Sequence, residues 1–154
     1  DRVSTRILDV RDTASVNAGV AAANPDILFN GAGFVHHGDV LAATEEDWAF
    51  AVDLNVTSQL RTIKAAVPGM LERRRGHVVN IASGAGKVGV AYGTSYCASK
   101  HGLVGFTNAL RAEYEREPVG FSVGTRGGST GKLGMPRENA AVTTRRQVFV
   151  WSSM

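Results

Sequence analysis

Short apolar runs alternate with longer segments of helical period along this chain. The apolar runs at residues 5–10, 26–30 and 77–82 have the length and composition of strands. Residues 44–70 and 95–117 instead carry apolar side chains at helical spacing. Strands alternating with helices are typical of βα units that build a parallel sheet, so the sequence predicts an α/β fold.

The ends of the predicted helices carry local signals. Thr44 is a suitable N-cap with Asp47 three positions later, and Pro118 follows the end of the second helix. The run of Val78, Val79 and Ile81 is almost unbroken, which favours a strand covered on both faces. These signals predict one long helix at 44–70, a second at 95–117 and a buried strand before that second helix.

The pattern breaks after Gly124. Residues 124–134 hold five glycines and few apolar side chains, and residues 147–151 form a lone strand-like run. Glycine is abundant overall, with 18 in 154 residues, and this indicates many tight turns or close backbone approaches. We therefore expect a partial domain at residues 1–123 and a divergent segment at 124–154.

Composition and charge restrict the classes of function. The chain is 44% apolar and 20% charged, which is usual for a globular protein. It has no apolar run of the roughly 18 residues that a membrane span needs, and its first residues lack the apolar core of a signal peptide. We expect a cytoplasmic protein without a membrane partner. Cys97 is the single cysteine, so an internal disulfide is excluded.

The net charge of +3 does not indicate nucleic-acid binding. The excess lies in residues 118–154, which carry five Lys and Arg against one acidic residue, while the body of the chain is near neutral. Arg73, Arg74 and Arg75 cluster at the end of a predicted helix, where cations favour the helix dipole. His36 and His37 have no evident third ligand, so no metal site is expected.

Tyr96 and Lys100 are the most informative candidates for chemistry. They are four residues apart and share one face of the predicted helix, where the ammonium can lie beside the phenol. A phenol ordinarily holds its proton at neutral pH, and a neighbouring cation favours the phenolate. Ser83 ends the strand at 77–82, at the sheet edge where α/β proteins usually place their sites. Each feature alone is also common on helix surfaces or in turns.

Several motifs in order give the chain a resemblance to the short-chain dehydrogenase/reductase family. Asn30-Gly31-Ala32-Gly33 follows a strand, Asn55 lies in the long helix, and Tyr96-Cys97-Ala98-Ser99-Lys100 begins thirteen residues after Ser83. Residues 26–38 look most like the cytosolic type 2 3-hydroxybutyrate dehydrogenase group. The resemblance covers residues 5–123. It implies a Rossmann-like, doubly wound parallel sheet, here incomplete because the first βαβ unit is missing and the C-terminal segment diverges.

The resemblance also implies roles for individual residues. Tyr96 would be the general acid and base, Lys100 would favour its phenolate form and bind the nicotinamide ribose, Ser83 would hold the substrate oxygen, and Asn55 would position a proton-relay water. Asp9 and Val10 match the family's adenine contact. The loop that passes beside the cofactor corresponds to Asn30, Gly31, Ala32 and Gly33. The implied cofactor is NAD or NADP, and the subgroup favours NAD.

Three departures from the family pattern affect this reading. The phosphate loop T-G-x-x-x-G-x-G is absent from the sequence, and Gly84 to Gly89 does not replace it because no acidic residue stands about 20 positions on. A Pro-Gly strand end is missing after residue 123, and Gly31 replaces the more usual asparagine. With the first two strands missing, we expect residues 5–10 to lack a neighbour and one edge of the strand at 26–30 to be bare.

Two hypotheses follow from the sequence. In the first, the chain is most of the core of a reductase that interconverts a secondary alcohol and a ketone, and its substrate is 3-hydroxybutyrate-like or a 3-oxoacyl compound. In the second, the chain is a truncated, non-catalytic fragment of such an enzyme and binds no cofactor. The expected partner is a small-molecule substrate. The resemblance further implies a homotetramer for the parent enzyme, paired through the helices at 44–70 and 95–117.

Overall fold

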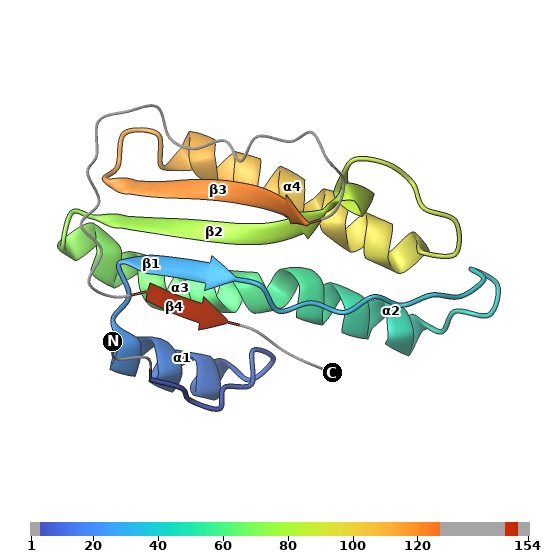
Figure 1. Ribbon diagram of the computed structural model, residues 1–154, viewed down its shortest axis with the longest axis horizontal. Helices are drawn as coiled ribbons and strands as arrows, with labels where there is room; N and C mark the ends of the chain where they lie inside the picture. The colour runs from blue at the N-terminus through green and yellow to red at the C-terminus, as the bar shows by residue number, and fades with distance from the viewer. Residues whose placement is uncertain (1–3, 127–146, 151–154) are drawn as a thin grey trace.

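Four parallel strands form the sheet of this protein, in the order β3–β2–β1–β4 (Figure 1). The computed structural model describes residues 4–126 and 147–150. The strands are β1 (Ile27–Asn30), β2 (Gly76–Ser83), β3 (Val119–Arg126) and β4 (Gln147–Val150). The chain therefore has the incomplete α/β, Rossmann-like architecture that the sequence predicts.

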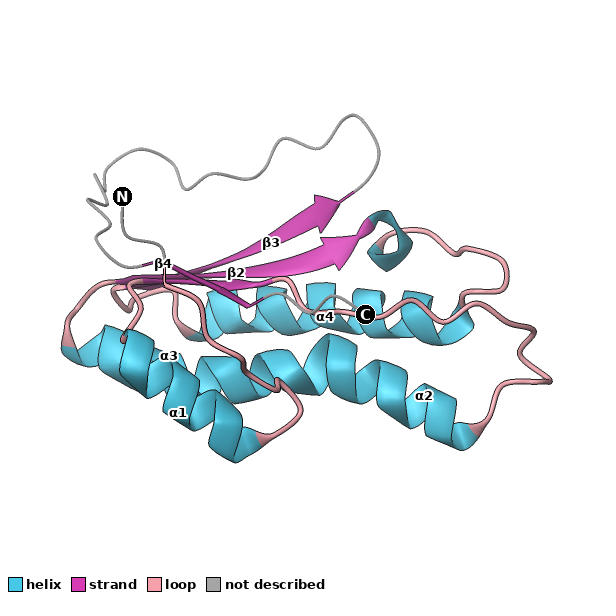
Figure 2. Cartoon of the chain, turned by 60° about the horizontal axis from the view of Figure 1, so that its bottom comes forward, coloured by secondary structure: helices cyan, strands magenta, loops and turns pink. Residues whose placement is uncertain are grey.

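The helices lie on one side of this sheet (Figure 2). The α-helices are α1 (Thr13–Ala23), α2 (Glu45–Val52), α3 (Ser58–Glu72) and α4 (Thr94–Glu113). A π-helix at Asp53–Thr57 joins α2 directly to α3, and a 3₁₀ turn at Gly84–Gly86 follows β2. Within the described residues no helix is long and apolar enough to cross a membrane.

The long helix predicted at 44–70 is confirmed as one continuous helical segment, which extends to Glu72. Thr44 caps it, because its hydroxyl accepts a hydrogen bond from the Asp47 backbone N–H at 3.1 Å. Three acidic residues in the first turn complement the helix dipole. The π-helix inserted in this segment was not predicted, because apolar spacing does not distinguish a π turn from an α turn.

The helix predicted at 95–117 is confirmed with shorter bounds. It begins at Thr94 and ends at Glu113, four residues before the predicted end, and the next residues form turns. The strands predicted at 26–30 and 77–82 are also confirmed within one or two residues. Asp26 lies just before β1, and its carboxylate pairs with Arg75 at 3.1 Å and with Arg73 at 3.4 Å. Two of the three clustered arginines thus bind this carboxylate.

The strand predicted at 5–10 is wrong. Residues 4–9 have no regular secondary structure, and helix α1, which the sequence reading did not identify, follows them. An extended segment becomes a strand only when its backbone finds a neighbouring strand, and β1 is paired on both sides. The expectation of a bare edge on β1 is also wrong, because β4 pairs with that edge in parallel. Residues 127–146, where the sequence predicts divergence, lie outside the described residues.

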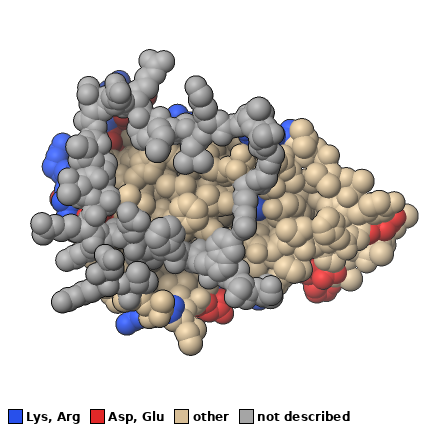
Figure 3. Space-filling model, in the orientation of Figure 1, with Lys and Arg blue, Asp and Glu red and all other residues tan. Residues whose placement is uncertain are grey.

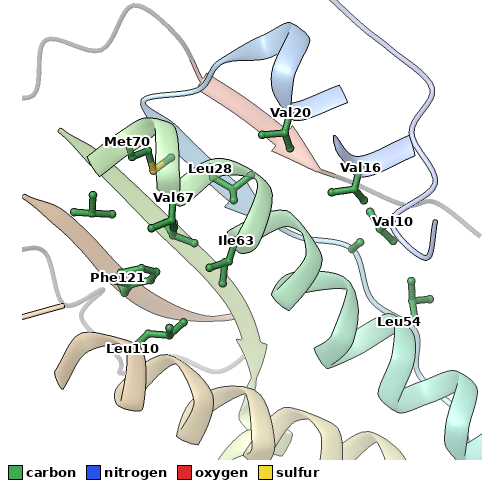
Figure 4. Close-up of a cluster of buried hydrophobic side chains, with 14 residues drawn as sticks. Val10, Val16, Val20, Leu28, Leu54, Ile63, Val67, Met70, Leu110 and Phe121 are labelled. Carbon is green, nitrogen blue, oxygen red and sulfur yellow. The ribbon is translucent and has the colours of Figure 1, made fainter. Parts of the chain in front are cut away.

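The apolar core fills the space between the helices and one face of the sheet (Figure 4). Leu28 and Val78 contribute from the two central strands, and Met70 from α3, each with no exposed surface. The apolar run in β2 predicts a strand buried on both faces. The structure buries one face fully, whereas the other face is only half-buried at Val79 and Ile81. Because the helices pack on one face of the sheet, α4 and the π-helix lie beside the carboxyl ends of β1 and β2.

Candidate active site

Tyr96 and Lys100 lie one turn apart near the start of α4. The Lys100 Nζ atom is 5.7 Å from the centroid of the Tyr96 ring, as their spacing on the helix predicts. Lys100 is 4% exposed, and its Nζ donates a hydrogen bond to the carbonyl of Ile81 at 2.9 Å. The ammonium is therefore held between the end of β2 and the aromatic ring.

Burial determines the electrostatics of this lysine. Removing the amine from water disfavours its charged form and lowers the pKa of Lys100 to about 8. A group with this pKa is still protonated in roughly nine molecules of ten at pH 7. The site thus presents a poorly solvated cation beside the Tyr96 ring, and Tyr96 is itself half-buried. Within the described part of the chain, the Tyr96 hydroxyl makes no hydrogen bond and is available to a ligand.

Asn55 lies in the π-helix, opposite the start of α4. Its side chain has no exposed surface, and its Oδ1 accepts from the Phe34 backbone N–H at 2.8 Å. Its Nδ2 donates to the Phe34 carbonyl at 2.9 Å and to the Ser99 hydroxyl at 3.0 Å. These contacts fix which end of the amide is oxygen, because a flipped amide would place two acceptors against each other at the Phe34 carbonyl.

Ser99 connects Asn55 to the helix that carries Tyr96. The Ser99 hydroxyl accepts from Asn55 and donates to the backbone carbonyl of Tyr96 at 2.8 Å. Ser99 is 3% exposed, so this link is shielded from water. The π-helix and the first turn of α4 are therefore held in a fixed relation by a chain of hydrogen bonds.

Gly33 lies where the loop after β1 passes these side chains. A Cβ atom at this position would lie 3.1 Å from Asn55 Oδ1 and 3.4 Å from Lys100 Nζ. A larger residue would crowd both groups, so the small residue predicted for this loop has a steric cause. Asn55 and Lys100 thus meet beside an exposed glycine, which leaves backbone accessible next to them.

Ser83 ends β2 and lies near the same part of α4. The 3₁₀ turn that follows it packs tightly on α4, since a Cβ atom on Gly86 would lie 2.7 Å from the Lys100 carbonyl oxygen. The Ser83 hydroxyl accepts from the Ala85 backbone N–H at 3.3 Å and caps this turn. It keeps its own proton for a further partner. The turn motif from Gly84 onward therefore supports Ser83 and α4 and begins no α-helix of its own.

Asn30 plays a structural part in the sheet. It is 2% exposed, its Nδ2 donates to Asn80 Oδ1 at 2.9 Å, and its Oδ1 lies 2.9 Å from the Thr62 hydroxyl. Asn80 in turn donates to the Thr107 hydroxyl at 3.1 Å. This buried ladder ties β1 and β2 to α3 and α4. Any contact of residues 30–33 with a cofactor therefore involves their backbone rather than the Asn30 side chain.

Asp9 and Val10, expected near the adenine, lie in the loop before α1. Asp9 is exposed, and its Oδ1 accepts from the Arg11 backbone N–H at 2.8 Å. Val10 is 5% exposed and its side chain belongs to the core. Arg11 reaches across to Asp53 at 3.1 Å, so this loop is joined to the helical segment that carries Asn55. The Asp9 side chain is therefore open to solvent.

The sequence reading missed three residues that hold the site together. Ser99, Gln59 and Asp53 were not among its candidates, although Ser99 lies inside the Tyr96–Lys100 segment and Gln59 is one helical turn after Asn55. A polar residue one helical turn after Asn55, on an otherwise apolar helix face, is a signal that could have identified Gln59. The described residues contain no group of three or more His, Cys, Asp or Glu side chains able to hold a metal ion.

On the face shown in Figure 3, the charged side chains of the described residues lie mostly along the edges of the molecule. A hollow of about 430 Å³ lies over the start of α2, lined by Val40, Ala43, Thr44, Glu45 and Trp48. It contains none of the expected catalytic residues. The candidate site lies instead where buried polar side chains gather around Asn55 and Lys100.

Comparison with known proteins identifies the family of this chain. The family described as short chain dehydrogenase matches residues 1–135. The chain is 40% identical over 121 residues to a 2-keto-3-deoxy-L-fuconate dehydrogenase of Xanthomonas campestris, covering 77% of this chain and 40% of that protein. It is 36% identical over 119 residues to dehydrogenase/reductase SDR family member 6 of Rattus norvegicus, covering 76% and 49% of the two chains.

The fold has solved counterparts as well. An actinorhodin polyketide ketoreductase, solved with NADPH, superposes with a TM-score of 0.74 at 40% identity, covering 77% of this chain and 48% of that one. The present chain thus spans about half the length of the relatives it matches. The family match over most of the chain, together with these identities, shows that the protein belongs to the short-chain dehydrogenase family.

Proposed function

We propose that this chain carries the catalytic part of an NAD(P)-dependent oxidoreductase that interconverts a secondary alcohol and a ketone. The observation that carries the proposal is a buried group of side chains at the start of α4, in which Asn55 bonds Ser99, Ser99 bonds the Tyr96 backbone and Lys100 lies beside the Tyr96 ring. A phenol next to a poorly solvated ammonium is suited to exchange a proton with an alkoxide oxygen. Relatives named as a dehydrogenase and a ketoreductase support this reaction class.

The residues present fit the nicotinamide half of a dinucleotide. Gly33 leaves backbone open beside Lys100, and the Lys100 ammonium uses one of its N–H groups on Ile81 within the described residues. Its remaining N–H groups are free to bind the ribose hydroxyls. The exposed Asp9 carboxylate is suited to an adenine contact. When bound, the nicotinamide supplies or accepts the hydride that the protein's own side chains cannot provide.

Each catalytic side chain then has a distinct task. The Tyr96 hydroxyl gives its proton to the ketone oxygen in reduction and takes it back in oxidation. The Ser83 hydroxyl donates a hydrogen bond to the same oxygen and orients it. Lys100, beside the Tyr96 ring, binds the nicotinamide ribose, and Asn55 positions a water that returns the proton from solvent. Burial of Asn55 and Lys100 keeps these groups in place before a ligand arrives.

The nature of the cofactor and substrate is proposed more broadly. The NADPH in the ketoreductase structure supports NADP, while the resemblance of residues 26–38 to a 3-hydroxybutyrate dehydrogenase group supports NAD. We propose a small hydroxy acid or a 3-oxoacyl compound as substrate. We also propose a cytoplasmic location and, for the parent enzyme, a homotetramer paired through α4 and the continuous helical segment from α2 to α3.

A second candidate is a non-catalytic fragment that binds no dinucleotide. It is favoured by the sequence, in which T-G-x-x-x-G-x-G does not occur, so that the pyrophosphate has no helix N-terminus to bind. On this basis residues 1–123 form a partial catalytic domain and residues 124–154 a divergent segment. We expect the 154-residue chain alone to bind NADH weakly or not at all. A micromolar dissociation constant measured by calorimetry on the folded chain would contradict this expectation.

The two candidates separate in one experiment. NADH and NADPH oxidation is measured with acetoacetate and a panel of small ketones, on this chain and on a version that carries an added N-terminal βαβ segment from a relative. Turnover in the extended version alone supports the reductase proposal and identifies the given chain as its catalytic part. Absence of turnover in both versions supports the non-catalytic candidate.

A further inference from the structure

The Arg11 side chain binds two different groups on the helical segment that carries Asn55. Its Nε donates to an Asp53 carboxylate oxygen at 3.1 Å, and its guanidinium carbon lies 4.7 Å from the centroid of the Phe50 ring. A guanidinium can make both contacts at once, because its N–H groups lie in its plane and its faces are free to stack on an aromatic ring. Arg11 is therefore held by α2 and by the π-helix together, although its side chain is 48% exposed.

Asp53 begins the π-helix that carries Asn55. Its backbone carbonyl accepts from the Ser58 N–H, five residues on, and a hydrogen bond of this span makes the turn wider than an α turn. Its carboxylate binds Arg11 with one oxygen and Arg61, on α3, with the other at 2.7 Å. The Arg61 Nη1 atom is buried and has no hydrogen-bond partner among the described residues, so this guanidinium depends on the Asp53 carboxylate. Asp53 thus ties the start of the π turn to both of its flanks.

The aromatic contact of Arg11 leads to the loop that binds the Asn55 side chain. Phe50 packs edge to face on Phe34, with ring centroids 5.2 Å apart and an interplanar angle of 84°. The Phe34 backbone holds both ends of the Asn55 amide, because its N–H donates to Oδ1 at 2.8 Å and its carbonyl accepts from Nδ2 at 2.9 Å. Arg11 is therefore connected to this amide by two routes, through the turn that carries Asn55 and through the loop that binds its side chain.

We propose that Arg11 is a positioning residue for the Asn55 amide, an inference that rests on the proposed function. Arg11 holds the π turn and the loop at Phe34 in a fixed relation, and the Asn55 side chain lies between them with its oxygen and both amide protons bonded. The backbone N–H of Arg11 also donates to the Asp9 carboxylate at 2.8 Å. One residue thus orders both the loop proposed to contact the adenine and the amide proposed to position the catalytic water.

Hydrogen exchange of the Asn55 side-chain amide tests this role without cofactor or turnover. The 154-residue chain is labelled with ¹⁵N-asparagine, and exchange with water is measured for the native chain, for Arg11→Met and for the control Arg6→Met. Arg6 lies in the same N-terminal segment and donates one long hydrogen bond, at 3.4 Å to the Ala18 carbonyl. The Asn80 amide is the internal reference, because it has no exposed surface and bonds across the sheet, far along the chain from Arg11.

In Arg11→Met the Asn55 amide is expected to exchange about three- to tenfold faster than in the native chain, while the Asn80 amide keeps its native rate. Arg6→Met is expected to change neither rate. Asp53→Asn removes the same ion pair from its other side and is also expected to speed exchange at Asn55, so the proposal stays testable if Arg11→Met does not fold. Unchanged exchange at Asn55 in the folded variants overturns the proposal, as does an equal acceleration at Asn80, which would indicate general loosening of the fold.

Turnover separates this inference from the function on which it rests. In an active extended version of the chain, Arg11→Met is expected to lower kcat by about 10- to 100-fold and to leave KM for the ketone near its native value, because the reacting groups are misplaced while the substrate contacts remain. An unchanged kcat overturns the positioning role. Faster exchange at Asn55 in a chain whose extended version has no turnover refutes the proposed function and leaves the effect of Arg11 on the amide standing.

Discussion

Replacing Lys100 by methionine tests the burial of the ammonium at the centre of the site. Methionine has a similar length and carries no charge, so the variant removes the titration of this group with little change in packing. In the native protein, burial lowers the pKa of Lys100 from its ordinary value of 10.5 to about 8. The native state then loses its proton near pH 8, while the unfolded chain keeps its proton until about pH 10.5.

The sign of the effect follows from proton binding. Between pH 8 and 10.5 the unfolded state binds more protons than the native state, so native stability rises with pH across this window. A difference of about 2.5 pKa units at about 1.4 kcal/mol per unit gives up to about 3 kcal/mol, present in full only above pH 10.5. Below pH 8 the unfavourable burial of the charge is present in full, partly offset by the hydrogen bond to Ile81.

The assay is urea unfolding followed by circular dichroism, at several pH values from 7 to 10. The free energy of unfolding of the native chain is expected to gain about 2 to 3 kcal/mol relative to Lys100→Met across this range. Lys64→Met, on an exposed part of α3, is expected to show the same pH dependence as the native chain. A constant difference between the native chain and Lys100→Met at every pH would refute the reasoning.

Three further changes test the fold around the site. Asn80→Ala removes two buried hydrogen bonds and is expected to lower the free energy of unfolding in urea by about 2 to 3 kcal/mol, since its former partners stay buried. Gly86→Ala places a Cβ against the Lys100 carbonyl and is expected to lower the melting temperature, whereas Gly89→Ala, which meets open space, is not. Thr44→Ala removes a helix cap, with an expected loss of about 1 kcal/mol in the same urea assay.

The sequence predicted the elements whose signals are local. The capped start of the helix at Thr44, the apolar run at β2 and the helical spacing around Tyr96 each depend on a few neighbouring residues, and all three elements are confirmed. The failure at residues 5–10 has a different cause. Those residues have strand-like composition, but a strand also needs a neighbour, and neighbours are set by the whole sheet. The pairing of β1 with β4 could not be inferred from either segment alone.

The candidate site shows the same division. The spacing of Tyr96 and Lys100 fixes their shared helix face, and the structure places them together. The Ser99 hydroxyl and the Gln59 amide both bond Asn55, and Asn55 lies in a π-helix that shifts the register of the side chains around it. Composition carries no signal for such a turn. The buried hydrogen bonds of Asn30 could likewise not be predicted from the sequence. An asparagine at a strand end is equally compatible with ligand binding and with sheet packing.

The central claim is that Tyr96 exchanges the proton with the substrate oxygen, and its hydroxyl is the group to remove. The rate of NAD(P)H oxidation with a ketone substrate is measured in the extended version of the chain, for Tyr96→Phe and for Tyr114→Phe. Tyr114 is a suitable control because it packs on Phe121, with ring centroids 5.2 Å apart, as part of the core. The account predicts a loss of about 10²- to 10⁴-fold for Tyr96→Phe and an unchanged rate for Tyr114→Phe. An equal rate in both variants would contradict it.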